Sequence, residues 1–106
     1  MTELENELLD LLTEDYYGLW EVEVQLPVGR DRVRETIASL LHQGLAEWFV
    51  REDDAAVAVA LSELAEPLPN LEEPTAWAVP AKRERQYLLA ATEAGEDAYF
   101  RRAGFN

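Results

Sequence analysis

The strongest constraint on the fold is a helical pattern that stops at a glycine and continues at once as a strand pattern. After residue 30, four apolar residues recur at the spacing of one helical face: Val33, Ile37, Leu40 and Leu41. Gly44 then ends this helix, because glycine readily adopts the left-handed backbone of a C-terminal cap. Residues 45–51 are rich in aromatic and β-branched side chains, which predicts a strand. The chain must therefore combine helices with strands.

The N-terminal residues predict a helix with its own start signal. Thr2 and Glu5 have the spacing of a capping box, in which each side chain accepts a backbone N–H from the other residue. Behind them four leucines repeat at helical spacing: Leu4, Leu8, Leu11 and Leu12. We predict a helix over residues 3–14, and we expect the fold to begin at the start of this chain with no leader before it.

Residues 19–26 support two interpretations. Four apolar residues alternate with polar ones, as in a half-buried strand: Trp20, Val22, Val24 and Leu26. Leu19, Val22 and Leu26 also lie on one helical face. Local propensity favours the strand, and periodicity alone leaves the choice open.

The chain is predicted to turn back on the first strand after residue 51. A polar turn at 52–54 precedes alternating alanine and valine at 55–60, which fits a second strand. The same residues could instead begin a short helix through Leu61 and Leu64. We favour a strand, then a helical turn from Ser62.

Prolines restrict the next segment. Four of the five prolines fall between Pro67 and Pro80, which excludes a regular helix or a central strand there. The stretch is too apolar for a free linker, since it carries Leu68, Leu71, Trp77 and Val79. We expect an ordered loop that packs on the core and is anchored by Trp77.

The C-terminal part predicts a strand followed by a helix. Residues 86–91 form an apolar run, and Thr92 is a suitable N-cap. Acidic residues occupy the first helical turn, where the helix dipole favours them: Glu93, Glu96 and Asp97. Arg101 and Arg102 suit the other end of the helix, which Gly104 is expected to stop.

The composition indicates a folded, acidic protein. The 106 residues include 22 Asp and Glu against 9 Lys and Arg, a net charge of −13, while 48% are apolar. A disordered acidic tail would be poorer in apolar residues. The charge disfavours non-specific binding to nucleic acid or to anionic membranes. Cysteine and a signal peptide are absent, and no apolar run approaches the roughly 18 residues that span a bilayer. We expect a soluble, cytoplasmic protein.

Two stretches are typical of one family of folds. Residues 30–49 look like the second helix of a helix-turn-helix and its exit into a strand. Residues 89–95 (Leu-Ala-Ala-Thr-Glu-Ala-Gly) look like the end of a wing and the start of a last helix. With the order of the elements, they make the chain resemble a winged helix-turn-helix domain of the bacterial transcriptional-regulator type.

The resemblance implies a single α+β domain over residues 1–106. This domain has three N-terminal helices, a small antiparallel sheet with an extended wing, and a C-terminal helix. Residues 19–26 would be the first helix of the helix-turn-helix motif, against the strand interpretation. Residues 61–85 would be an ordered, proline-rich insertion in the wing.

The charge is unevenly distributed along the chain. Residues 1–29 hold eight acids and no base, and residues 52–79 hold seven acids and no base. Residues 30–51 and 80–106 each have a net charge of +1. The excess of acids therefore lies outside the two segments that a winged helix presents to DNA.

Six cations in those two segments are candidate contacts with DNA or with a partner: Arg30, Arg32, Arg34, Lys82, Arg83 and Arg85. Arginines at the start of a recognition helix could pair with guanine edges or phosphates. Alternatively, they balance acids beside them, such as Asp31 and Glu35. The acidity makes a basic protein partner our first hypothesis and sequence-specific DNA binding the second. An acidic mimic of DNA is the third.

The aromatic residues divide into core and interface candidates. Three tryptophans sit within apolar patterns and are expected in the core: Trp20, Trp48 and Trp77. Five other aromatic residues are candidates for an interface: Tyr16, Tyr17, Tyr99, Phe100 and Phe105. Because winged-helix regulators commonly dimerise through terminal helices, the resemblance implies a possible homodimer.

The sequence offers little for catalysis, so we expect no enzyme and no cofactor. The single histidine, His42, borders the apolar face of a helix. Ser39 and Ser62 lie outside known nucleophile motifs. Residues 52–54 lack the glycine and the spacing of a calcium loop, and no glycine-rich phosphate loop occurs.

Overall fold

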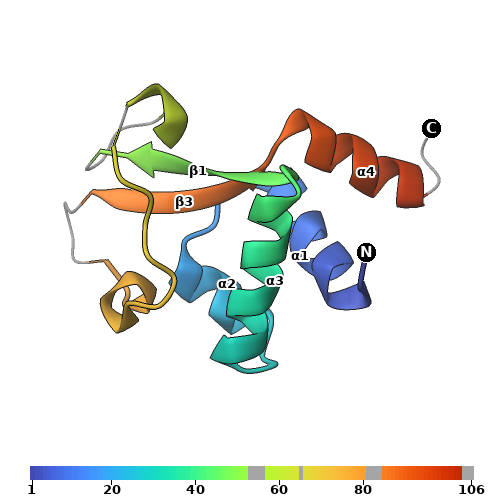
Figure 1. The fold of residues 1–106 in the computed structure, drawn as a ribbon, viewed down its shortest axis with the longest axis horizontal. Coiled ribbons are helices and arrows are strands. Elements are labelled where there is room, and N and C mark those ends of the chain that lie inside the picture. The colour runs from blue at the N-terminus through green and yellow to red at the C-terminus, as the bar shows by residue number, and fades with distance from the viewer. Residues whose placement is uncertain (53–56, 65, 81–84, 104–106) are drawn as a thin grey trace.

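A computed structural model describes residues 1–52, 57–64, 66–80 and 85–103 (Figure 1). These residues form an α+β fold, as predicted, with four α-helices and an antiparallel sheet of order β2-β1-β3. The α-helices are α1 (Glu3–Glu14), α2 (Leu19–Gln25), α3 (Arg30–His42) and α4 (Glu93–Ala103). The strands are β1 (Ala46–Arg51), β2 (Val59–Ala60) and β3 (Gln86–Ala91), and the 3-10 helices are η1 (Leu61–Glu63) and η2 (Pro74–Trp77). In these ranges no helix is long and apolar enough to cross a membrane.

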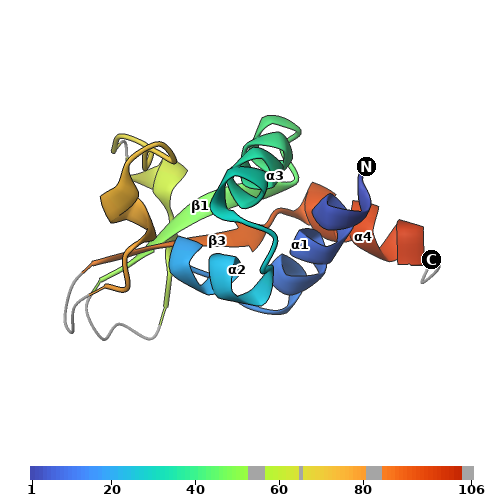
Figure 2. The same ribbon diagram turned by 90° about the horizontal axis from the view of Figure 1, so that it is seen from below.

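The elements are arranged along the two long strands. In Figures 1 and 2, β1 and β3 run side by side, η1 and η2 lie at one end of the molecule, and α4 lies beside α1 at the other. Helix α3 contacts β1, and α1 contacts α3, α4 and β3. One face of β1 is buried against the helices by Ala46, Trp48 and Val50. The helices and the sheet thus share one core.

This core takes its buried side chains from α1, α2, α3, β1, β3 and the two 3-10 helices, and Tyr99 of α4 packs against it. Its most buried side chains are Leu8, Leu9, Val22, Val33, Ile37, Leu40, Leu61 and Leu89. Full burial of one such side chain stabilises a fold by about 1.5–3 kcal/mol. The predicted helix over 3–14 is confirmed by α1, including its capping box between Thr2 and Glu5.

The predicted junction at Gly44 is also confirmed. Gly44 has a positive φ of 73°, and its N–H donates to the Leu41 carbonyl over 3.1 Å. The next N–H, that of Leu45, donates to the Leu40 carbonyl over 2.9 Å. This pair of bonds is a Schellman motif, which satisfies carbonyls that the end of α3 leaves free. The chain then enters β1 within two residues.

The preference for a strand at residues 19–26 is wrong, and the helix implied by the resemblance is present as α2. The Gly18 N–H donates to the Glu21 side chain over 3.0 Å, which starts the helix. Leu19, Val22 and Leu26 are buried, whereas Val24 is 68% exposed. Burial at helical spacing therefore outweighs the strand propensity of the alternating residues.

The second strand is shorter than predicted where it is described. Among residues 57–60, only Val59 and Ala60 pair with β1, opposite Val50 and Phe49. Residues 57–58 are outside any strand, and residues 53–56 lie outside the described residues. The next residue, Leu61, is 1% exposed, so its burial turns the chain into η1. The predicted helical turn thus begins one residue early.

The proline-rich stretch is an ordered, packed loop where it is described. Trp77 is 3% exposed, and its indole N–H donates to the Leu71 carbonyl over 2.9 Å. Pro74 opens the 3-10 helix η2, a position that needs no N–H. The expected anchoring by Trp77 is therefore confirmed. Of the predicted insertion over 61–85, residues 65 and 81–84 lie outside the described residues.

The predicted strand over 86–91 is confirmed, and α4 begins at the predicted cap. The Thr92 hydroxyl accepts the Gly95 N–H over 3.0 Å and donates to the Gly44 carbonyl over 2.7 Å. Gly95 lies so close to β1 that a Cβ atom there would be 1.9 Å from the Leu45 carbonyl oxygen. The expected stop at Gly104 lies outside the described residues.

We predict that Gly95→Ala destabilises the protein by about 2 kcal/mol or more, because the methyl group must displace backbone. Helix propensity alone predicts the opposite, a gain of about 1 kcal/mol. Urea unfolding of both proteins distinguishes these signs. Ala94→Gly, on the exposed side of the same helix, is the control and should cost about 1 kcal/mol. A more stable Gly95→Ala variant would contradict the close packing.

Candidate functional site

The first candidate cation, Arg30, is neutralised by a residue of α2. Its Nε and Nη2 atoms donate to the two carboxylate oxygens of Glu23, over 2.7 and 3.0 Å. Its guanidinium also lies 5.2 Å from the ring centroid of Trp77. The hydrogen bond to Arg30 lowers the pKa of Glu23, so this carboxylate stays charged. Arg30 is therefore held against the protein by a forked ion pair and an aromatic ring.

Arg34, one helical turn further, is also neutralised. It bonds Asp31 on its own helix over 2.6 Å. Its Nε is 3.5 Å from a carboxylate oxygen of Glu72, in the loop before η2. The proline-rich segment therefore places an acid beside the face of α3 that carries Arg30 and Arg34.

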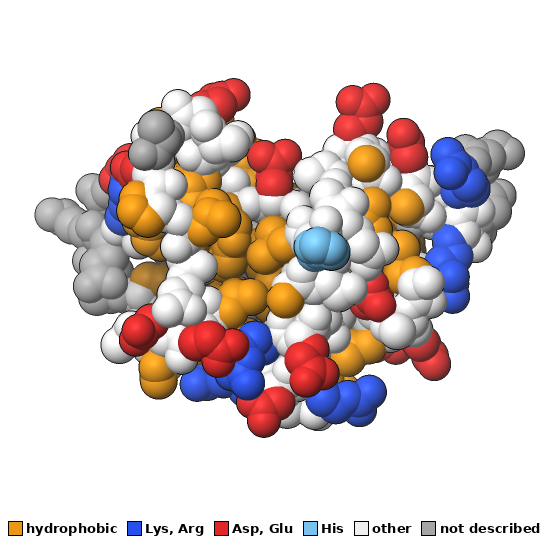
Figure 3. Space-filling view, viewed as in Figure 1, with side chains coloured by type: hydrophobic (Ala, Val, Ile, Leu, Met, Phe, Trp, Pro, Cys, Tyr) orange, Lys and Arg blue, Asp and Glu red, His pale blue; other side chains and the backbone are white. Residues whose placement is uncertain are grey.

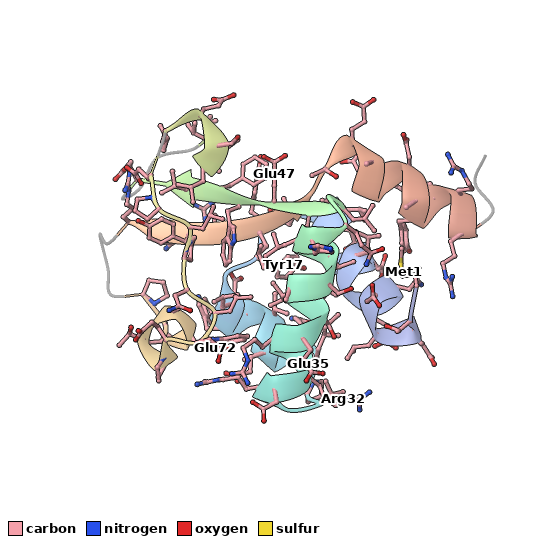
Figure 4. The ribbon with its side chains drawn as sticks, viewed as in Figure 1. Met1, Tyr17, Arg32, Glu35, Glu47 and Glu72 are labelled. Atoms are coloured by element: carbon pink, nitrogen blue, oxygen red, sulfur yellow. The ribbon has the colours of Figure 1, made fainter. Side chains whose placement is uncertain are left out.

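Arg32 lies on a different side of α3. Two residues correspond to about 200° around a helix, so Arg32 projects almost opposite to Arg30 and Arg34. Figure 4 shows Arg32 and Glu72 on opposite sides of α3. Arg32 is exposed and forms no ion pair with any residue that the structure describes. The three arginines thus do not form one face.

Arg85 forms ion pairs with two acids. Its Nε donates to Glu52 and its Nη1 to Glu66, each over 2.6 Å. The hydrogen bond to Glu66 raises the pKa of Arg85 most, and the hydrogen bond to Glu52 raises it further. Its guanidinium also lies 5.8 Å from the Tyr87 ring. The other two candidates of this run, Lys82 and Arg83, lie outside the described residues.

A mostly apolar hollow of about 230 Å³ lies between the C-terminal end of α3 and the residues around η1. We call it the α3 hollow. It is lined by Leu41, Ala46, Glu47, Trp48, Leu61, Ser62 and Leu68. Figure 3 shows apolar side chains gathered on this face, with acidic side chains around them and Lys or Arg side chains along the lower edge. The labelled Glu47 side chain lies on β1, between η1 and α3 (Figure 4).

Sequence reasoning missed this hollow. In the sequence, Leu61 and Leu68 are only apolar residues after the first strand. No local pattern indicates that they line a hollow with Leu41. Both residues are far from α3 in the sequence. The hollow forms because η1 packs back against β1.

A buried carboxylate joins α1 to α3. Glu5 is 9% exposed and accepts hydrogen bonds from Gln43 Nε2 over 2.8 Å and from the Ser39 hydroxyl over 3.2 Å. The Thr2 N–H completes the set at 3.3 Å. Burial alone would raise the pKa of Glu5, but the hydrogen bonds from Gln43, Thr2 and Ser39 outweigh it and lower the pKa. Ser39 therefore has a structural partner.

The interface candidates lie in two places. After α1, Tyr16 is exposed with its ring edge-on to Phe49, at 5.0 Å between centroids, and Tyr17 pairs its backbone with Leu89 of β3. On α4, the Tyr99 hydroxyl donates to Asp10 of α1 over 2.6 Å, and its ring contacts Phe100. Phe105 lies outside the described residues.

The tryptophans divide differently from the prediction. Trp48 and Trp77 are buried, at 5% and 3% exposure, as expected. Trp20 is only half-buried, and it lines a hollow of about 160 Å³ with Tyr87 and Val79. Its indole therefore lies at the margin of the core.

The described residues contain no group of metal-ligating side chains. His42 is exposed on the last turn of α3. Within the described part of the chain, no three His, Cys, Asp or Glu residues are grouped to hold a metal ion. Comparison with protein-family models, with curated proteins and with solved structures gives no match to this chain.

We predict that Glu5 contributes to stability in a pH-dependent way. A carboxyl group whose pKa is lowered by folding stabilises the fold above its unfolded value, near 4.5, and this contribution is lost as the pH falls through the folded value. The stability difference between the natural protein and Glu5→Gln should therefore be largest at neutral pH and shrink below pH 4.5. Urea unfolding at several pH values measures it.

Glu7→Gln removes one charge from the exposed side of the same helix and serves as the control for charge alone. A stability difference for Glu5→Gln that stays constant from neutral to acid pH would contradict a lowered pKa at this site.

Proposed function

We propose that this chain is a non-enzymatic winged-helix regulatory or interaction module that binds a basic protein partner. The order of elements supports the winged-helix part: three helices, an antiparallel sheet and a last helix. In this proposal, α2 and α3 are the helix-turn-helix pair, and β1 with β2 begins the wing. The proline-rich segment extends the wing and folds back toward α3, where Glu72 meets Arg34.

The observation that carries the partner assignment is that three of the four described candidate cations are paired with carboxylates, Arg32 being the exception. Arg30, Arg34 and Arg85 are each bound to acids. To bind phosphates, these guanidiniums would have to exchange carboxylate partners for DNA, while the displaced acids repelled the approaching duplex. The same acids would attract a basic protein surface.

Sequence-specific DNA binding is the second candidate. Arg32 favours it, because this side chain is exposed and is not paired with a described acid. An acidic mimic of DNA is a third and narrower candidate, supported by the net charge of −13.

DNA binding by the natural protein and by a charge-released variant tests the proposal. We expect no saturable binding to genomic duplex fragments at moderate salt. The variant Glu23→Gln, Asp31→Asn, Glu72→Gln should gain affinity for DNA at low salt, because it frees Arg30 and Arg34.

The control variant carries the same change of three charges on exposed acids of α1 and α4: Glu7→Gln, Glu14→Gln and Glu93→Gln. It should gain much less DNA affinity. If the natural protein binds genomic fragments with a steep salt dependence, and charge reversal at Arg32 and Arg34 abolishes binding, the DNA candidate replaces the protein partner.

A homodimer remains a prediction of this proposal. The exposed Phe100 on α4, at 40% exposure, and Tyr16 are the described aromatic residues that could contribute to it. Light scattering at micromolar concentration should give about twice the chain mass of 12.0 kDa. A uniform monomer would exclude the dimer without affecting the proposed partner binding.

A further inference from the structure

The α3 hollow has the construction of a docking site for side chains. Its floor is formed by Ala46 and Trp48 of β1, which are 5% exposed. Leu41 at the end of α3 forms one wall, and Leu61 with Leu68 forms the other. A helix, a strand and the residues in and after η1 therefore surround the hollow.

Its apolar lining includes an exposed side chain. Leu68 lines the hollow and is 69% exposed. Burial of a leucine side chain is worth about 1.5–3 kcal/mol. A hollow bordered by an exposed leucine thus has apolar area left for a partner to cover.

The negative charge at the hollow favours a basic partner. Glu47 lines it, and Glu63 follows Ser62 in η1. Among the described residues that line it there is no Lys and no Arg, and the chain as a whole carries −13. An acidic ligand would be repelled, whereas lysines or arginines beside apolar side chains would be attracted to the margin.

A helix suits this shape. On a helix, residues at i, i+3 and i+4 project from one face, so a single turn presents two or three apolar side chains together. A hollow of about 230 Å³ is small for a ligand pocket but takes such a cluster. The polar face of the helix would then meet the acids at the margin.

We propose that the α3 hollow binds a basic amphipathic helix of the partner protein, with apolar side chains between Leu41 and Leu68 and cationic side chains toward Glu47. This inference rests on the proposed function and specifies where and what the module binds.

A model peptide tests the inference. The probe is a helix-forming peptide of leucine and lysine of about 15 residues, with leucines at i, i+3, i+4 and i+7. A peptide of the same composition with scrambled leucines is the first control. We expect only the amphipathic peptide to bind saturably, with NMR shift changes at Leu41, Leu61, Leu68 and the Trp48 indole.

Two variants locate the binding. Leu68→Glu should weaken it about tenfold or more, because the carboxylate would lie in an apolar contact. Val24→Glu makes the same change of charge at a residue of α2 that is equally exposed, at 68% against 69% for Leu68. It should leave affinity unchanged.

The other outcomes overturn the inference. Equal binding of the scrambled peptide, or equal loss in the Leu68→Glu and Val24→Glu variants, would show attraction by charge alone and leave the proposed basic partner in place. No saturable binding, or a dimer that Leu68→Glu dissociates, would mean that the hollow has another occupant. Failure of the proposed function itself would appear separately, as DNA binding in the salt experiment.

Discussion

The structure depends on one close junction, where the end of α3, the start of β1 and the start of α4 meet. Gly44 and Leu45 leave α3 through the Schellman motif. Their carbonyls then accept the Thr92 hydroxyl over 2.7 Å and the Thr92 N–H over 3.0 Å. Gly95 presses against the same Leu45 carbonyl without room for a side chain. Because these contacts involve backbone, they fix α4 and the sheet relative to α3.

Away from this junction, the acidic chain uses several carboxylates to pair with arginines. An excess of 22 acids over 9 bases suggests a surface covered by free carboxylates. In the described residues, however, several acids are used to hold arginines: Glu23 holds Arg30, Glu72 approaches Arg34, and Glu66 holds Arg85. Such exposed pairs add little to stability. Their consequence is on recognition. A paired guanidinium is a poor phosphate ligand, and at Arg34 and Arg85 two acids for one arginine leave a net negative charge that would attract a basic protein.

The segment after β1 also forms part of the α3 hollow. Leu61 is buried against β1, which turns the chain toward α3 and leaves Leu68 exposed at the edge of a hollow. Trp77, in η2, packs against the guanidinium of Arg30. The proline-rich segment thus has two effects beside α3. Its Glu72 lies near Arg34, and its Leu68 lines the α3 hollow. Both effects favour a protein partner over DNA.

The sequence by itself determined the elements with strong local signals. The capping box at Thr2, the helix end at Gly44 and the cap at Thr92 were predicted correctly, because neighbouring residues satisfy those backbone groups. The strand at 86–91 was predicted from its run of apolar residues, and its backbone pairs with the distant β1. The tertiary structure decided the points that local propensity left open or gave wrongly. Residues 19–26 are a helix, as the resemblance implied against local propensity, because the core buries Leu19 and Val22. Residues 57–58, which were predicted as strand, lie outside β2, which holds Val59 and Ala60. Which acid meets which arginine, and whether Leu68 faces Leu41, depends on contacts between residues far apart in the chain, and no local pattern encodes these.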